Sequence, residues 1–289
     1  MKLMVIPNSI NGIKDSLDYV DAFLIGIKDL SVNMNFTVSI DELGSILDII
    51  GNKELFISIN KNLSNDDIEI VKDIMIKLNE YKVKGLFYYD VGILNIYNSI
   101  EVSYDLVWAS EHAATNCDTI NYWNSFGVKY CMVSSDITIK DVYEIRNKTS
   151  CKLIVPIFGY VSMFNSKRHI VKNYLDYFNL NDSFKINYME KEGEVYPIID
   201  NKLGTTVYTN YILNGIIEYN NLKNNGIDYL LFNGFNIDSN KFIDVLKKVK
   251  DINSDNVLEC YEYINSLFDN TSTGFLYQDT IVKVKKDEK

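Results

Sequence analysis

Short apolar runs recur along almost the whole chain, and stretches with helical periodicity separate them. Most positions in each run are apolar, which is typical of parallel strands that are buried on both faces. The runs that predict strands are residues 2–6, 22–27, 55–60, 85–91, 106–109, 130–134, 152–157 and 229–233.

The segments between these runs predict helices. Residues 64–81 show the pattern most clearly, because their apolar side chains repeat at the spacing of one helical face. Ser39 is a candidate N-cap, with Glu42 at the spacing of a capping box. The predicted helices are residues 39–50, 64–81, 116–126, 138–147, 211–225, 239–250 and 257–268.

Eight strands that alternate with helices predict an α/β fold, a TIM-like (β/α)8 barrel. A doubly wound open sheet is the alternative. After the seventh strand the alternation of strands and helices stops, and a β-hairpin is predicted instead. Residues 184–188 and 195–199 flank a Lys-Glu-Gly-Glu turn. A further β run follows at residues 205–209, so we expect a hairpin insertion at about 183–209.

No linker divides the chain, so we expect a single barrel domain over residues 1–289. Residues 256–286 form its C-terminal part, a helix and a tail. The tail, residues 274–286, alternates apolar and polar positions as a strand does.

Composition narrows the class of protein. The net charge of −10 disfavours non-specific binding of nucleic acid, so a role on RNA needs a local basic patch or a basic partner. The four cysteines form no CxxC pair, which argues against a zinc site or a disulfide framework and favours a reducing cytoplasm. We expect no membrane span and no signal peptide.

In a barrel of this kind the functional site lies at the C-terminal ends of the strands. Glu111 and His112 follow the fifth strand, and as neighbours on a strand end they point to opposite faces. His112 suits a general base, although a surface histidine is equally compatible. Asp90 follows the fourth strand and either takes part in catalysis or caps the next helix. We predict Glu111, His112 and Asp90 as catalytic residues.

Substrate binding is predicted for a second group of polar residues. Arg168 is the strongest candidate, because a guanidinium at a barrel mouth grips a carboxylate or phosphate with two hydrogen bonds. Asn60 either binds substrate or bonds the backbone of a loop. The predicted binding residues are Arg168, Asn60, Ser166, Lys28 and Asn116. His112 and His169 with Asp90 or Glu111 would make a metal site, but nothing in their spacing requires one, so we predict none.

Residues 158–175 predict an active-site loop that leads into a helix, and they also carry a family resemblance. Gly159, Ser166 and Arg168 match the signature of the peptidase U32 family. Where that signature has its first histidine and its two cysteines, this chain has Phe158, Ser162 and His169. The resemblance extends along nearly the whole chain, through Asp21, Ala22, Gly26, Asn60, Asp90, Gly92, Ser110, Glu111 and Asn116.

The chain resembles in particular the short Firmicutes-type branch of this family. That branch occurs beside a longer, cysteine-bearing paralogue, and the resemblance implies 5-hydroxyuridine formation at the wobble position of tRNA. The reaction it implies depends on prephenate and is associated with iron–sulfur chemistry. The expected partners are therefore the paralogue and tRNA.

An iron–sulfur cluster needs about four thiolates, and both signature positions lack them here. We therefore expect no cofactor bound by this chain, prephenate as a co-substrate, and a cluster only in the partner. The alternative function is a U32-type peptidase, a collagenase-like hydrolase. The sequence contains no G-x-S-x-G, H-E-x-x-H or P-loop motif to support it.

Overall fold

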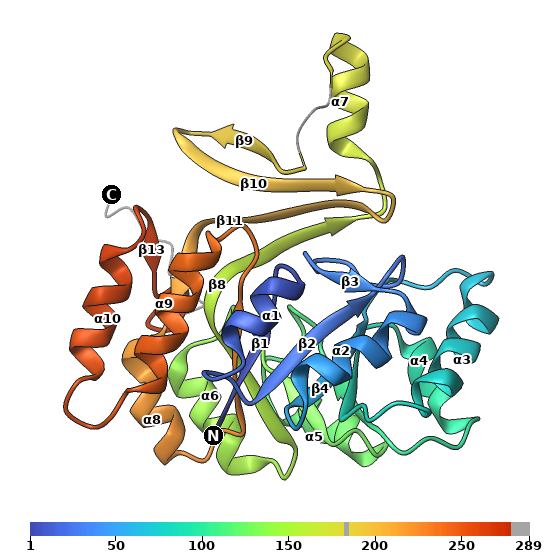
Figure 1. Ribbon diagram of the computed structural model, residues 1–289, viewed down its shortest axis with the longest axis horizontal. Helices are drawn as coiled ribbons and strands as arrows, with labels where there is room; N and C mark the ends of the chain where they lie inside the picture. Colours follow the sequence, from blue (N-terminus) through green and yellow to red (C-terminus); the bar gives the residue numbers. More distant parts are fainter. Residues whose placement is uncertain (182–184, 279–289) are drawn as a thin grey trace, which may run out of the picture.

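A computed structural model describes residues 1–181 and 185–278, and its central feature is a closed barrel of eight parallel strands (Figure 1). The last barrel strand pairs with both the first and the seventh, which closes the sheet. The TIM-like barrel is therefore confirmed over the open sheet. The barrel strands are β1 (Lys2–Ile6), β2 (Ala22–Ile27), β4 (Glu54–Ile59), β5 (Gly85–Tyr88), β6 (Asp105–Trp108), β7 (Tyr130–Met132), β8 (Lys152–Ser166) and β12 (Tyr229–Asn233).

Most helices cover the outside of the barrel, where they bury one apolar face against the strands. Glu42 accepts hydrogen bonds from the backbone N–H and the hydroxyl of Ser39, as the capping-box spacing predicts. The helical segments are α1 (Ile10–Ser16), η1 (Ile40–Glu42), α2 (Leu43–Ile50), α3 (Asp67–Leu78), α4 (Val91–Asn98), α5 (Cys117–Ser125), α6 (Ile139–Lys148), α7 (Ile170–Phe178), η2 (Ile216–Glu218), α8 (Tyr219–Asn224), α9 (Ser239–Lys250) and α10 (Val257–Ser266).

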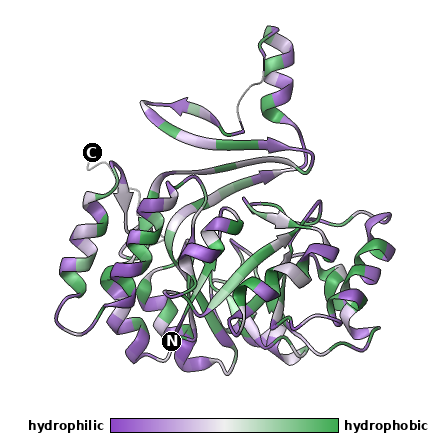
Figure 2. Ribbon diagram, viewed as in Figure 1, coloured by the Kyte–Doolittle hydropathy of each residue, from purple (hydrophilic) through white to green (hydrophobic). Residues whose placement is uncertain are grey.

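The barrel strands are apolar on both faces (Figure 2), because alternate side chains enter two different cores. One core lies between strands and helices, and the other fills the barrel itself. Phe56 is central to the inner core, where its ring meets Phe87, Tyr130 and Tyr229 edge to face at centroid distances of 5.5–5.8 Å. These rings fill part of the barrel interior.

An antiparallel arm rises from the C-terminal end of the barrel (Figure 1). The second half of β8 leaves the barrel and pairs with β11 (Gly204–Asn214). Strand β11 pairs with β10 (Glu194–Asn201), and β10 pairs with β9 (Asn187–Lys191). The hairpin after the seventh strand is thus present, and Glu192-Gly193 forms its turn. Two short strands complete the sheet, β3 (Thr37–Val38) beside β2 and β13 (Thr271–Ser272) beside β11.

Three predicted elements need correction. Residues 158–166 are strand rather than loop, since β8 continues through Ser166. Residues 211–214 are strand rather than helix, because Ile212 and Leu213 are buried against the core as part of β11. Residues 274–277 form a turn instead of a strand, while 279–286 of the predicted tail and 183–184 of the predicted insertion lie outside the described residues.

Gly159 marks the point where β8 leaves the barrel. Its φ of +112° lies in a region that favours glycine, and a Cβ atom would lie 2.1 Å from the backbone oxygen of Asn233. The pairing of β8 with β12 shifts register at this same level. A glycine is therefore needed for β12 to close the barrel against a strand that is turning away.

Candidate functional site

A cavity of about 690 Å3 lies between the barrel mouth and the arm. A smaller cavity of about 100 Å3 continues from it into the barrel, and the two share five polar residues that recur below. The shared polar residues are Asn33, Asn60, Glu111, His112 and Tyr208. Because the cavity occupies the C-terminal end of the barrel, its position agrees with the usual site of this fold.

The loop after β2 forms one wall of the cavity. Gly26 lets this loop fold over the barrel, since a Cβ there would lie 2.8 Å from Cβ of Ser31. Asn60 pins the loop, because its amide accepts from the N–H of Val32 at 2.8 Å and donates to the same residue's carbonyl at 3.1 Å. Asn60 therefore bonds loop backbone, the second of the two roles that its position predicts.

Asn33 is the residue that this loop presents to the cavity. Its φ is +59°, a conformation that asparagine tolerates better than most side chains. Its amide nitrogen donates to Oε1 of Glu111 at 2.7 Å and to Oγ of Ser162 at 3.0 Å. Asn33 thus connects Glu111 at the barrel mouth with Ser162 on the arm.

The arm contributes the other half of the network. Asn165 and Thr206 are cross-strand neighbours on β8 and β11, beside a register shift that directs their side chains toward the barrel. Asn165 donates to Oε2 of Glu111 at 3.3 Å, and the Thr206 hydroxyl lies 2.8 Å from Oδ1 of Asn33 and 2.7 Å from Oδ1 of Asn165.

The count of hydrogens in this network bears on the charge of Glu111. Thr206 has one hydroxyl hydrogen and can donate it to only one of its two amide neighbours. Rotating either amide by 180° resolves that conflict, but then an amide oxygen faces an oxygen of Glu111. A proton on Glu111 turns this contact into a hydrogen bond, so the neutral carboxyl fits the network best.

Burial acts on Glu111 in the same direction. It raises the pKa of Glu111 above the ordinary value of 4.5, while hydrogen bonds from Asn33 and Ser162 oppose the shift. Burial also raises the pKa of Tyr208. The Tyr208 hydroxyl has no hydrogen-bond partner among the described residues, although its ring stacks on Phe235 at 3.9 Å.

His112 lies at the rim with its side chain about 55% exposed. Its Nδ1 is 2.8 Å from Oδ2 of Asp136, so the carboxylate orients the ring. The structure gives His112 no hydrogen bond to a serine, threonine or cysteine among the residues it describes. An oriented histidine is present, but without the bonded nucleophile of a hydrolase.

Three lysines also line the larger cavity. Lys61 lies 2.7 Å from Asp67, and Lys202 forms an ion pair with Asp29. Lys167 forms no ion pair within the part of the chain that the structure describes. Burial of Asp67 is outweighed by hydrogen bonds from Lys61 and Ser64, which lower the pKa of Asp67 to about 2.

Several predicted site residues lie outside the two cavity linings. Asp90 caps α4, since its two oxygens accept from the N–H groups of Gly92 at 2.8 Å and Leu63 at 2.9 Å. Asn116 caps α5 through the N–H of Thr119 at 2.9 Å. These contacts are those of helix caps, the alternative role predicted for Asp90. Lys28 is exposed and contributes to neither lining.

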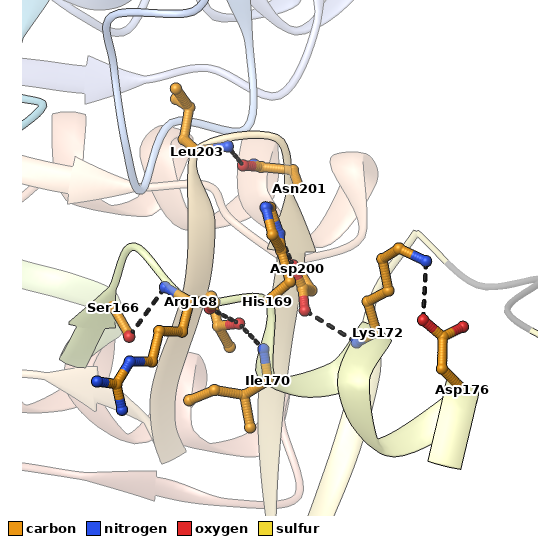
Figure 3. Close-up of polar contacts among 10 residues, drawn as sticks. Ser166, Arg168, His169, Ile170, Lys172, Asp176, Asp200, Asn201 and Leu203 are labelled. Atoms are coloured by element: carbon orange, nitrogen blue, oxygen red, sulfur yellow. Dashed lines mark hydrogen bonds and ion pairs between the residues drawn. The ribbon is translucent and has the colours of Figure 1, made fainter. Parts of the chain in front are cut away.

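The end of β8 and the turn after it hold Ser166, Arg168 and His169, which occupy positions of the family signature (Figure 3). Ser166 lines the cavity, and its hydroxyl accepts from the N–H of Arg168 at 3.1 Å. Nδ1 of His169 lies 2.9 Å from Oδ1 of Asp200, which ties the turn to β10. The exposed guanidinium of Arg168 bonds no described residue and lies outside the lining.

The donor set does not fit an iron–sulfur cluster. Ser162 and His169 occupy the signature cysteine positions, and both are engaged in hydrogen bonds. The four cysteines are dispersed, Cys117 on α5, Cys131 on β7, Cys151 just before β8 and Cys260 on α10. Burial raises the pKa of Cys151 to about 12, so that thiol stays protonated. Within residues 1–181 and 185–278, no three His, Cys, Asp or Glu side chains gather as a metal site.

Sequence reasoning selected Glu111, His112, Asn60 and Ser166, which the cavity brings together. It did not select Asn33, Asn165, Thr206 and Tyr208. Asn33 and Asn165 were visible only as polar residues near strand ends, and Thr206 and Tyr208 only as part of a β run. Their meeting depends on the arm folding back over the barrel.

The fold and the cavity define a (β/α)8-barrel protein whose mouth is roofed by a β-arm. A family model described as peptidase family U32 matches residues 10–284. The chain belongs to this family.

One relative is tRNA hydroxylation protein P2 of Bacillus subtilis (strain 168), which is 22% identical over 225 aligned positions, with 71% of this chain and 73% of the relative covered. Among solved structures, a putative dihydrodipicolinate synthase family protein from Coccidioides immitis superimposes with a TM-score of 0.51 at 7% identity, covering 91% of this chain and 76% of that one. A dihydrodipicolinate synthase gives 0.50 at 8% identity, with coverage of 92% and 82%. The solved structures support the barrel fold alone.

No helix within the described residues has the length and apolar character that a membrane span requires.

Proposed function

We propose that this chain is a cytoplasmic subunit of a tRNA wobble-uridine hydroxylation system that forms 5-hydroxyuridine. In this proposal prephenate is a co-substrate, and a longer, cysteine-bearing paralogue is the partner. The observation that carries the proposal is the similarity to tRNA hydroxylation protein P2, within a family match from residue 10 to residue 284.

The geometry of the cavity supports a binding role for this chain. Its volume of about 690 Å3 falls in the range of small-molecule and cofactor sites. Three lysines line it on a protein whose net charge is −10, which gives an anionic substrate a local point of attachment. The partly buried polar network would orient a substrate through hydrogen bonds rather than through charge.

The positions of the cysteines indicate which steps we assign to this chain and which to a partner. Hydroxylation is a redox reaction, and no described residue that lines either cavity is a cysteine. The positions that would supply thiolates hold Ser162, which bonds Asn33, and His169, which pairs with Asp200. We therefore assign to this chain the binding and orientation of substrate, and to the paralogue any cluster that the chemistry requires.

Deletion of the gene tests the proposal. Bulk tRNA from the deletion strain is digested to nucleosides and analysed by mass spectrometry for 5-hydroxyuridine and its derivatives. We expect these nucleosides to fall strongly and to return when the gene is supplied on a plasmid. Wild-type amounts in the deletion strain would contradict the proposal.

The hydrolase alternative has one observation in its favour, the orientation of His112 by Asp136. A hydrolase also needs a nucleophile within reach of that ring, and His112 has no such bonded partner among the described residues. Cleavage of gelatin or a peptide library by the purified chain, lost in His112→Ala, would favour the alternative.

A further inference from the structure

We propose that the cavity between the barrel mouth and the arm receives one pyrimidine base, flipped out of its RNA strand, whose imide edge is read by Glu111, Asn33 and Tyr208. The inference rests on the proposed function, since it takes the RNA substrate from there. It adds where the base binds, which side chains contact it and which edge of the base they recognise.

The hydrogen-bonding groups in the cavity suit an imide edge better than an anion. An imide edge carries two carbonyl acceptors on either side of an N–H donor, so its site must both donate and accept. The oxygens of Asn33 and Glu111 each keep a lone pair that can accept from the imide N–H, and the hydroxyl of Tyr208 can donate to a carbonyl. A site built for a carboxylate or phosphate would present donors alone.

Tyr208 supplies the hydroxyl donor of the proposed site. It is fully buried, it lines both cavities, and its hydroxyl has no partner among the described residues. Buried hydroxyls are generally bonded, because an unbonded one has lost its water without compensation. A carbonyl oxygen of a bound base would supply the acceptor that this hydroxyl lacks.

Two aromatic rings at the rim of the cavity are about half exposed to solvent. Tyr89 and Phe164 are each about 47% exposed, and both line the larger cavity. Exposed aromatic rings beside a groove provide stacking surfaces for bases, whatever the sequence of the strand. Stacking of this kind would compensate a nucleotide for leaving its neighbours in the RNA.

Positive charge at the rim suits the RNA backbone. Lys61, Lys167 and Lys202 line the cavity, so the phosphates on either side of a flipped base would pass cations. Two of these lysines are already held in place by ion pairs with Asp67 and Asp29. The charged rim and the hydrogen-bonding interior thus correspond to the two parts of a nucleotide.

The matched variants Tyr208→Phe and Tyr88→Phe test the inference. Each change removes a buried, unpartnered hydroxyl, but Tyr88 belongs to the core between strands and helices and lines neither cavity. The probe is an anticodon stem–loop RNA with uridine at the wobble position, and its binding to the full chain, with the paralogue if the two co-purify, is followed by fluorescence anisotropy.

We expect Tyr208→Phe to weaken binding roughly twofold to tenfold, the loss typical of one hydrogen bond, and Tyr88→Phe to leave it unchanged. Replacing the wobble uridine by cytidine, which lacks the imide N–H, should weaken binding to the wild type. Equal affinity of Tyr208→Phe and wild type overturns the inference, and so does equal weakening by Tyr88→Phe or no binding by the wild type.

The outcome separates this inference from the proposed function. If the deletion strain loses 5-hydroxyuridine while Tyr208→Phe binds as the wild type does, the proposed function stands and the base site is wrong. If uridine-selective binding depends on Tyr208 while the deletion strain keeps its 5-hydroxyuridine, the base site stands and the proposed function is wrong.

Discussion

Glu111 is the residue on which the account of the cavity depends. Its two oxygens face amide groups from the loop after β2 and from β8, so the side chain connects barrel and arm. Its raised pKa and the hydrogen count of the network both favour the neutral form. Binding through a neutral carboxyl needs no counter-ion, which suits an uncharged base.

The charge of Glu111 predicts how stability changes with pH. Below its ordinary pKa of 4.5 the residue is neutral in the folded and unfolded states, and the wild type should resemble Glu111→Gln. As pH rises above 4.5, the unfolded state loses its proton first, so the wild type should lose stability relative to the variant until the folded pKa is passed.

Urea unfolding of both proteins across this pH range measures the difference. The other groups that face Glu111, namely His112, Asp136 and Tyr208, are present in both proteins, so their own titration largely cancels. A difference that stays constant with pH, or one that favours the wild type as pH rises, would show that Glu111 is ionised in the fold.

Gly159 allows a second test at the scale of one residue. Gly159→Ala places a Cβ against the backbone oxygen of Asn233 and requires a φ of +112°, so we expect a loss of roughly 3 kcal/mol in the free energy of unfolding. Gly51→Ala is the control, because Gly51 also has a positive φ but no atom within 4 Å. The control should cost about 1 kcal/mol. Equal losses would mean that the close approach to β12 is unimportant.

At the scale of elements, sequence patterns were most informative inside the barrel and least informative in the arm. Strands β1, β2 and β12 begin and end as predicted, because strands that are buried on both faces form nearly continuous apolar runs with clear ends. The sequence pattern predicts a loop for the second half of β8, because its polar residues lie over a cavity rather than against a core. Ile212 and Leu213 fitted a helical or a strand pattern equally well.

Helix α7 gives a prediction of its own. None of its residues is buried, and Tyr177 is 80% exposed, so the helix contributes little to the core. The double variant Tyr174→Ser/Tyr177→Ser should change the free energy of unfolding by no more than about 0.5 kcal/mol. Phe242→Ala, at a buried position on α9, should cost about 3–5 kcal/mol. A large loss in the α7 variant would show that this helix packs more tightly than its exposure indicates.

At the scale of the whole molecule, the sequence predicted the barrel and the family, but only part of the site. Glu111 and Asn60 were found because strand ends are recognisable. Asn33 and Thr206, which are 173 positions apart, come together only because the arm returns over the barrel mouth. A contact between residues so far apart in the sequence leaves no local sequence pattern that could predict it.

The dispersed cysteines predict that this chain works without a cluster of its own. A variant with Cys117→Ser and alanine at the three buried positions, Cys131, Cys151 and Cys260, should restore 5-hydroxyuridine in the deletion strain as the wild-type gene does, once its folding is verified by circular dichroism. Anaerobically purified wild-type chain should contain no stoichiometric iron. Loss of complementation by a folded variant, together with bound iron, would place the cluster here instead.

The amount of wobble 5-hydroxyuridine in tRNA from the deletion strain tests the central claim most directly, with the gene returned as wild type or as Glu111→Ala. We predict that the deletion strongly lowers the amount of the nucleoside, that the wild-type gene restores it, and that a stably expressed Glu111→Ala does not. Unchanged 5-hydroxyuridine in the deletion strain would contradict the account of what this protein does, and full restoration by Glu111→Ala would contradict the account of where it does it.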